Sequence, residues 1–414
     1  MNRMEPFRRD RLTWLAYAML AWFAYLQAAP GLIVPHLRDE LHLSYATGGL
    51  HVAAWAGGSV VAGLGATALE RVLGRRAVFW LAPVGMAAGL VVLTLGRAAP
   101  VTVGALLFMG VWGGMLLITI QAALADRHGA RRTVALTEAN VAASVAYVVL
   151  IGALSLAAAT GAGWRVALLA SLAVPPVAFL LNRRQAIDAP PPPPAQDGPG
   201  RLPLAFWIAA ATMFCTTSAE WCVTAWGASF VKTAAHVSTD AGVSLMIGYF
   251  GGVVAGRTIG SRLARRHASQ RLLAVALAVT AAGFAVLWPA ATPGQALAGL
   301  AITGVGLGNL FPLALSFTVG LAPDRAQLAS GRAVLVTSAA VLVAPLLVGT
   351  VADATSLTAA LAAVPVALAL AAAGLTAAIR VHSTRSNPPA STKSSRPVRQ
   401  PRTASRTSGA GRSR

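Results

Sequence analysis

Apolar runs recur along the whole chain and constrain its fold more than any other feature. A helix needs about 20 mostly apolar residues to cross a bilayer. In lipid, only helices and closed barrels satisfy all their backbone polar groups. The runs of sufficient length fall at 12–34, 44–69, 77–96, 100–125, 133–158, 163–181, 203–231, 241–261, 271–290, 294–322, 329–351 and 357–379. We therefore predict an all-α membrane protein with about twelve transmembrane helices.

The scarcity of charged residues supports the same fold. Only 11% of the 414 residues are charged, whereas soluble domains carry about 25%. The net charge of +20 would suit nucleic acid, but the basic residues lie in short clusters between apolar runs. This is the usual place of charge in membrane-protein loops, so we expect no nucleic-acid partner. The first run exceeds the roughly 7–15 apolar residues of a cleaved signal peptide, and we interpret it as the first span.

A proline-rich break separates the first six runs from the last six. It contains five consecutive prolines, Pro190 to Pro194. Such a segment adopts an extended conformation without internal hydrogen bonds and cannot span lipid. The predicted organisation is a leader at 1–11, a six-helix bundle at 12–181, a linker at 182–202, a second six-helix bundle at 203–379 and a disordered basic tail at 380–414.

The distribution of lysine and arginine predicts the orientation. With twelve spans, 29 of the 33 basic residues fall on the side of the two termini. The exceptions are Arg38, Arg97, Arg165 and Lys232. Basic loops remain in the cytoplasm, so we expect a protein of the cell (inner) membrane with both termini and the linker cytoplasmic.

The two halves share a loop pattern. Asp126 and Arg127, after the fourth run, are echoed by Asp324 and Arg325 after the tenth. Transporters built from parallel repeats bind their substrate between the repeats, near the middle of the membrane. The repeat therefore predicts a central site between the two bundles.

Three short motifs lie near the ends of the predicted spans. They are Gly163, Trp164 and Arg165 at the start of the sixth run, Gly256, Arg257, Gly260, Arg262 and Leu263 at the end of the eighth, and Pro345, Gly349, Ala352 and Asp353 at the end of the eleventh. Over about residues 10–380, this series resembles the major facilitator superfamily of transporters. The resemblance implies two bundles that rock about a central site, and a monomer.

Other segments depart from that family's patterns. The loop after the second run carries Glu70, Arg71, Arg75 and Arg76 with stretched spacing, and Glu in place of the usual Asp. The fifth run lacks the Gly-Pro pair of drug–proton antiporters. The seventh run, with Glu220, Trp221 and Trp226, resembles sugar- and fucose-permease-like members. The subfamily is therefore left open.

Glu220 is the leading candidate for transport chemistry, because an ionisable group deep in a span is costly unless it has a role. Thr216 and Thr224 lie four residues to either side and share its helix face. We expect this face to carry a proton or to bind a polar substrate. The alternative is a neutral Glu220 that is hydrogen-bonded to a neighbouring helix.

Other polar residues in the spans are weaker candidates for the same cavity. They are Asn140, Ser144 and Tyr147 on one stripe of the fifth run, Asn309 in the tenth, and Tyr25 and Gln27 in the first. For Glu138, pairing with a loop arginine is favoured over substrate contact. The further gating candidates are Glu70, Arg71, Arg75, Arg76, Asp126, Arg127, Arg257, Asp324, Arg325 and Pro312.

These observations together predict secondary active transport of a small organic solute by alternating access, coupled to protons. The expected partners are the solute, protons and membrane lipid. A drug or metabolite efflux pump and a non-transporting membrane sensor of the same fold are the alternatives. We find no nucleophile–base set, metal cluster or phosphate loop, so we expect no enzyme activity, metal or cofactor.

Overall fold

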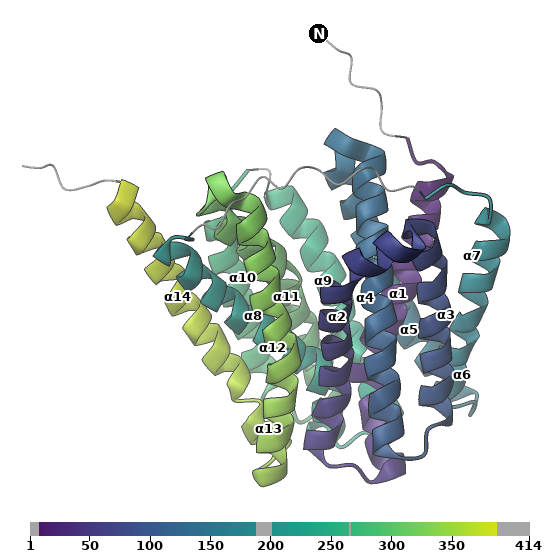
Figure 1. Cartoon of the computed structure of the whole chain (residues 1–414). Helices are drawn as coiled ribbons and strands as arrows, with labels where there is room; N and C mark the ends of the chain where they lie inside the picture. The colour runs from purple at the N-terminus through teal and green to yellow at the C-terminus, as the bar shows by residue number, and fades with distance from the viewer. Residues whose placement is uncertain (1–7, 188–200, 265, 387–414) are drawn as a thin grey trace, which may run out of the picture.

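The computed structural model describes residues 8–187, 201–264 and 266–386. Most of the predicted leader, linker and tail lie outside these ranges. Residues 380–386, which were predicted to begin the disordered tail, instead continue the last helix. The described chain is helical throughout its spans, which confirms the predicted all-α class (Figure 1).

The first bundle contains six spans. They are α1 (Arg11–Leu41), α2 (Tyr45–Leu73), α3 (Arg75–Leu95), α4 (Ala99–His128), α5 (Arg132–Ala159) and a broken sixth span of α6 (Trp164–Ala170), a short 3₁₀ turn (Ser171–Ala173) and α7 (Val174–Asn182). A further 3₁₀ turn (Gly129–Arg131) joins α4 to α5. Pro175 and Pro176 follow the break, and proline fits the first turn of a helix because its nitrogen has no hydrogen to leave unbonded.

The second bundle has the same number of spans. They are α8 (Leu204–Ala234), α9 (Thr239–Leu263), α10 (Ser269–Leu287), α11 (Pro293–Gly320), α12 (Ala326–Ala354) and a last span of α13 (Leu357–Ala360) and α14 (Ala363–Ser386). Within the described residues, 11 helical segments are long and apolar enough to cross a membrane. The remaining span, α8, has 31 residues, as α1 does, and it contains Glu220.

Side chains in the loops define where several spans begin. The Asp10 carboxylate accepts the backbone N–H of Thr13 at 2.9 Å and caps α1. Ser44 and Ser238 cap α2 and α9 in the same way. Each cap satisfies a backbone donor that the first turn of a helix leaves without a partner.

Both ends of the described chain lie at one end of the molecule, at the top of Figure 1. We call this the terminal end and the other the opposite end. The bundles meet mainly along three helix pairs, α1 with α8, α2 with α12, and α5 with α9, and α1 also touches α9. Any functional group between the bundles is therefore carried by these helices.

Glycines allow the bundles to approach closely. A Cβ atom added to Gly31 of α1 would lie 2.2 Å from the backbone oxygen of Thr224 in α8. One added to Gly349 of α12 would lie 2.5 Å from the backbone oxygen of Tyr45 in α2. Small residues at such crossings let the backbones themselves pack together.

Candidate functional site

A small polar cavity lies between the two bundles. Its volume is about 50 Å³, which is enough for a few water molecules or one small chemical group. The lining residues are Gln27 and Ala28 of α1, Tyr147 of α5, Glu220, Trp221 and Thr224 of α8, and Tyr249, Phe250, Val253 and Arg257 of α9. Gln27, Tyr147 and Glu220 each lie near the midpoint of their helix.

Glu220 contributes an acidic side chain to this cavity. It is partly exposed, and its oxygens accept no hydrogen bond from any described residue. The charge that acts on it across the cavity is that of Arg257. A carboxyl group without a partner in the middle of a span is available to a proton or to a ligand.

Arg257 reaches across the boundary between the bundles. Its Nη1 donates a hydrogen bond to Ser144 Oγ of α5 at 2.8 Å, and its Nε donates to the Gly308 oxygen of α11 at 3.4 Å. No described carboxylate lies within 4.0 Å of its guanidinium. Arg257 was predicted as a gating residue, whereas its side chain lines the cavity.

Hydroxyl and aromatic groups complete the cavity walls. The Tyr147 hydroxyl donates to Gln27 Oε1 at 3.4 Å, and the hydroxyls of Thr224 and Tyr249 lie 2.8 Å apart. The Tyr147 and Phe250 ring centroids are 5.2 Å apart. The cavity therefore presents one acid, one base, an amide, hydroxyls and aromatic faces to a small solute.

The structure places four of the predicted cavity residues on this cavity: Gln27, Tyr147, Glu220 and Thr224. Ser144 meets the cavity through Arg257. Trp221, Tyr249 and Phe250 were not among the predicted cavity residues, although a tyrosine in the apolar eighth run was a usable signal.

Three other predictions for this cavity are corrected. Thr216 is buried and donates to the Met213 oxygen, so it does not share the cavity with Glu220. Asn140 is exposed and donates to the Leu136 oxygen within its own helix. Asn309 donates to the Gly256 oxygen at 2.7 Å and fastens α11 to α9. Asparagine and threonine often bond to nearby backbone, and hydropathy does not show which neighbour they take. Pro312, which was predicted as a gating residue, lies inside α11.

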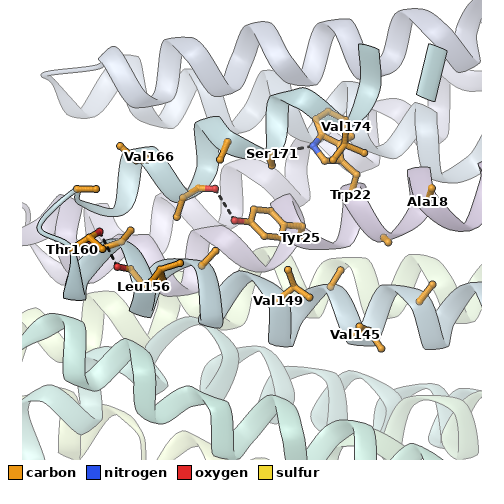
Figure 2. A pocket seen from close by; sticks show the side chains of 18 residues that line it. Ala18, Trp22, Tyr25, Val145, Val149, Leu156, Thr160, Val166, Ser171 and Val174 are labelled. Carbon is orange, nitrogen blue, oxygen red and sulfur yellow. Dashed lines mark hydrogen bonds between the residues drawn. The ribbon is translucent and has the colours of Figure 1, made fainter. Parts of the chain in front are cut away.

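Tyr25 also lies elsewhere, in a larger cleft formed by α1, α5 and the broken sixth span (Figure 2). This cleft has a volume of about 620 Å³ and mostly apolar walls. The Tyr25 hydroxyl donates to the Ala167 oxygen at 2.7 Å, and Trp22 Nε1 donates to Ser171 Oγ at 3.3 Å. These bonds hold α1 against the sixth span, so Tyr25 is not a residue of the central cavity.

Polar contacts join the bundles at the opposite end. The Asp39 carboxylate of α1 accepts two hydrogen bonds from Lys232 Nζ of α8, both at 2.6 Å. The Asp353 carboxylate of α12 accepts the backbone N–H groups of Tyr45 and Ala46 at 2.7 and 2.8 Å. Asp353 was quoted for the family resemblance alone, and sequence analysis did not find its partner or the Asp39–Lys232 pair.

At the terminal end, the predicted gating residues form contacts within the first bundle. Arg75 Nη1 donates to Asp126 at 2.6 Å and also lies 3.7 Å from Glu70. Arg127 Nε donates to Asp10 at 2.6 Å. These contacts fasten α2, α3 and α4 to one another and α4 to the start of α1.

Glu138 makes the predicted pairing with an arginine. Its carboxylate accepts hydrogen bonds from Arg9 at 2.7 and 2.8 Å and from the Tyr17 hydroxyl at 3.0 Å. All three residues belong to the first bundle or its leader, so in this conformation the pair does not latch the two bundles together.

The other gating candidates lie at the surface of the terminal end. Arg71 and Asp324 are exposed. Arg76 donates to the Arg183 oxygen, and Arg325 donates to the Arg201 oxygen at 3.0 Å. These last two contacts hold the ends of the segments that lead into and out of residues 188–200.

Comparison with known proteins identifies the family. The model of the Major Facilitator Superfamily matches residues 13–323 and, in an overlapping alignment, 245–410. A mutant of the nucleoside transporter NupG is similar in structure, with a TM-score of 0.70 and 11% identity over 90% of this chain and 100% of that one. A bacterial homologue of the human lysosomal transporter Spinster, inward-facing and unoccupied, has a TM-score of 0.69 and 12% identity over 91% of this chain and 99% of that one.

At these identities the two structures show a common fold, and no curated protein matches the sequence. The family model covers most of the chain. The chain therefore belongs to the Major Facilitator Superfamily and is a multi-pass membrane transporter, not an enzyme.

Proposed function

We propose that this protein moves a small organic solute across the cell (inner) membrane by alternating access, coupled to protons through Glu220. One observation carries the proposal: a polar cavity lies between the bundles at mid-helix, and its acidic side chain has no hydrogen-bond partner among the described residues. A solute bound there is reached from one side or the other as the bundles rock about it.

The contacts between the bundles support an alternating mechanism. At the opposite end, Asp39–Lys232 and Asp353–Tyr45 join the two bundles. At the terminal end, the ion pairs Arg75–Asp126 and Arg127–Asp10 each remain within one bundle. With cytoplasmic termini, as the distribution of basic residues predicts, this is an inward-facing conformation, and the similar Spinster homologue is inward-facing too.

Proton coupling is proposed from the position of Glu220. A carboxyl group in a low-dielectric cavity is far easier to bury when protonated than when charged. If the proton moves with the solute, Glu220 is neutral while the protein passes through the occluded state between its two conformations. Arg257, facing the same cavity, remains charged throughout.

The proposal is tested with purified protein in liposomes that contain a pH-sensitive dye. Sugars, organic acids, amino acids and lipophilic drugs are first screened for a rise in melting temperature, since a ligand of the folded state must stabilise it. A solute that stabilises the protein is then added outside, and acidification of the interior is recorded. We expect solute-dependent proton entry in the wild type and none in Glu220→Gln.

Glu138→Gln is the matched control, because Glu138 is also an acid within a span but pairs with Arg9 outside the cavity. It should retain proton entry. Solute entry without proton movement would contradict proton coupling, whereas binding without any flux would favour the sensor.

Efflux of lipophilic compounds is the second candidate, and the apolar cleft of about 620 Å³ favours it. In that case lipophilic drugs, and not polar solutes, should stabilise the protein in the screen.

A further inference from the structure

We propose that Arg257 is the anion anchor of the central cavity, and that the transported solute is an organic monocarboxylate whose charge pairs with this guanidinium. The inference rests on the proposed transport site and specifies its substrate class. It follows from the contacts of Arg257, from the position of Glu220 and from the composition of the cavity wall.

Arg257 has unused hydrogen-bonding capacity. A guanidinium carries five N–H donors in a planar fork, and it never loses its charge in a protein. Only two of its donations go to described residues, the Ser144 hydroxyl and the Gly308 carbonyl, and both acceptors are neutral. Arg257 is half-buried, and a partly desolvated cation without an anionic partner is unfavourable; an anionic ligand in the cavity would supply that partner.

A carboxylate suits the geometry of this cation. Arginine binds carboxylates through two parallel N–H···O bonds, which fix the orientation of the ligand as well as its charge. The described part of the cavity wall has one basic side chain, Arg257. A single cation balances a single negative charge, so a monoanion fits better than a dianion.

The other walls suit an organic body behind the carboxylate. Tyr147 and Phe250 present aromatic rings with centroids 5.2 Å apart, and Trp221 also lines the cavity. Gln27 and Thr224 provide polar groups for a hydroxyl or carbonyl substituent. The cavity of about 50 Å³ admits a carboxylate-sized group in this conformation, which limits the solute to a small molecule.

Glu220 makes the anion and the proton bind cooperatively. It faces Arg257 across the cavity, and the two side chains interact electrostatically. While Glu220 is ionised, it competes with a solute carboxylate for the positive charge of Arg257, and its own negative charge repels the solute. Once Glu220 is protonated, the cavity has a net positive charge that favours an anion. Linkage requires the reverse as well, so a bound carboxylate tightens proton binding.

The remaining groups around Glu220 do not alter the sign of this coupling. The titratable side chains that face it in the cavity are Tyr147 of α5 and Tyr249 and Arg257 of α9. Gln27 of α1 and Thr224 of α8 do not titrate. Both tyrosines are neutral at physiological pH, so Arg257 sets the charge that the solute meets.

The test measures the melting temperature of the detergent-purified full chain with matched probes. Acetate, lactate, benzoate and 3-phenylpropionate are each compared with their amide and with an amine of the same skeleton. Measurements are made at about pH 5.5 and about pH 7.5, where simple carboxylic acids remain mostly ionised. Wild type should be stabilised by at least one carboxylate, more strongly at the lower pH, and not by its amide or amine.

Four variants assign the effect to residues. Arg257→Gln should abolish the stabilisation, and Arg257→Lys should leave a reduced one, because it keeps the charge but loses the planar fork. Arg262→Gln removes an exposed arginine from the same helix and should behave as wild type. Glu220→Gln should keep the carboxylate effect and lose its dependence on pH.

Stabilisation by amides or amines as strong as that by acids would overturn the inference. So would a carboxylate effect that survives in Arg257→Gln, or the absence of any carboxylate effect across the panel. The dye assay separates this inference from the proposed function. Flux of an uncharged solute would support the proposed transport function and contradict the role of Arg257 as an anion anchor. Binding of a carboxylate that depends on Arg257, without flux, would support the anion anchor and contradict transport.

Discussion

The Asp353 carboxylate at the end of α12 accepts the backbone N–H of Tyr45 at the start of α2, at 2.7 Å, so the second bundle caps a helix of the first. Ala46 donates to the other carboxylate oxygen at 2.8 Å. A negative charge at a helix N-terminus is stabilised by unpaired N–H groups and by the helix dipole. Because Asp353 and Tyr45 belong to different bundles, separation of the bundles at the opposite end would break this contact, so Asp353 should bias the protein towards this conformation.

Replacing Asp353 by Asn removes the charge and should destabilise the closed opposite end by about 1 kcal/mol, roughly a fivefold shift in population. Spin labels at Ala162→Cys and Ala291→Cys, in loops of the two bundles at that end, report the shift as a longer distance by pulsed electron resonance. Cys215 and Cys222 are replaced beforehand. Asp324→Asn makes the same chemical change at an exposed site of the terminal end, and it should leave the distance distribution unchanged.

The crossing of α1 and α8 should be intolerant of even one added carbon. Gly31→Ala places a Cβ atom 2.2 Å from the Thr224 oxygen, and such overpacking costs about 1–3 kcal/mol. We expect a lower melting temperature and a population shift away from the closed opposite end. Gly104→Ala in α4 is the control, because its Cβ would meet no atom within 4 Å. Equal melting temperatures for the two variants would show that α1 and α8 do not pack this closely.

Glu138 and Glu220 should respond oppositely to the same substitution. Glu138 lies near the surface with its partner Arg9, and such an exposed pair contributes little to stability. Glu138→Gln should therefore lower the melting temperature slightly and leave proton-coupled transport intact. Glu220→Gln should keep or raise stability, because it removes the need to bury an ionisable group, and abolish coupling. The two readouts are thermal unfolding and proton entry into liposomes.

Acid should loosen the start of α1. Partial burial alone would raise the pKa of Asp10, but hydrogen bonds from Thr13 and Arg127 outweigh burial and hold this pKa below its ordinary value. Such a group stabilises the folded state above its unfolded pKa, and the stabilisation is lost as pH falls through the folded pKa.

We therefore expect the wild type to lose more thermal stability than Asp10→Asn when the pH is lowered from about 6 to about 3, around the ordinary aspartate pKa. Thermal unfolding across that range measures the difference. Parallel curves for the two proteins would contradict a stabilising role of the ionised Asp10.

The sequence alone determined the number and the approximate limits of the spans, because hydropathy over about 20 residues is a local property that the bilayer selects directly. The run predicted at 133–158 is α5 at Arg132–Ala159, and the run at 241–261 is α9 at Thr239–Leu263. Glu220 could be singled out for a related reason. An acidic side chain in the middle of an apolar run is costly to place in the membrane whatever its neighbours are, which makes it a functional candidate.

Only the tertiary structure decided which polar groups meet. Arg257 was predicted as a gating residue at the end of a span, but α9 brings it to the cavity and to Ser144, 113 positions away in sequence. Thr216 and Tyr25 had equally suitable sequence positions, yet the packing turns them to other partners. A residue's hydropathy fixes its depth in the membrane, whereas its partners depend on how helices distant in sequence rotate and cross, which is a property of the whole assembly.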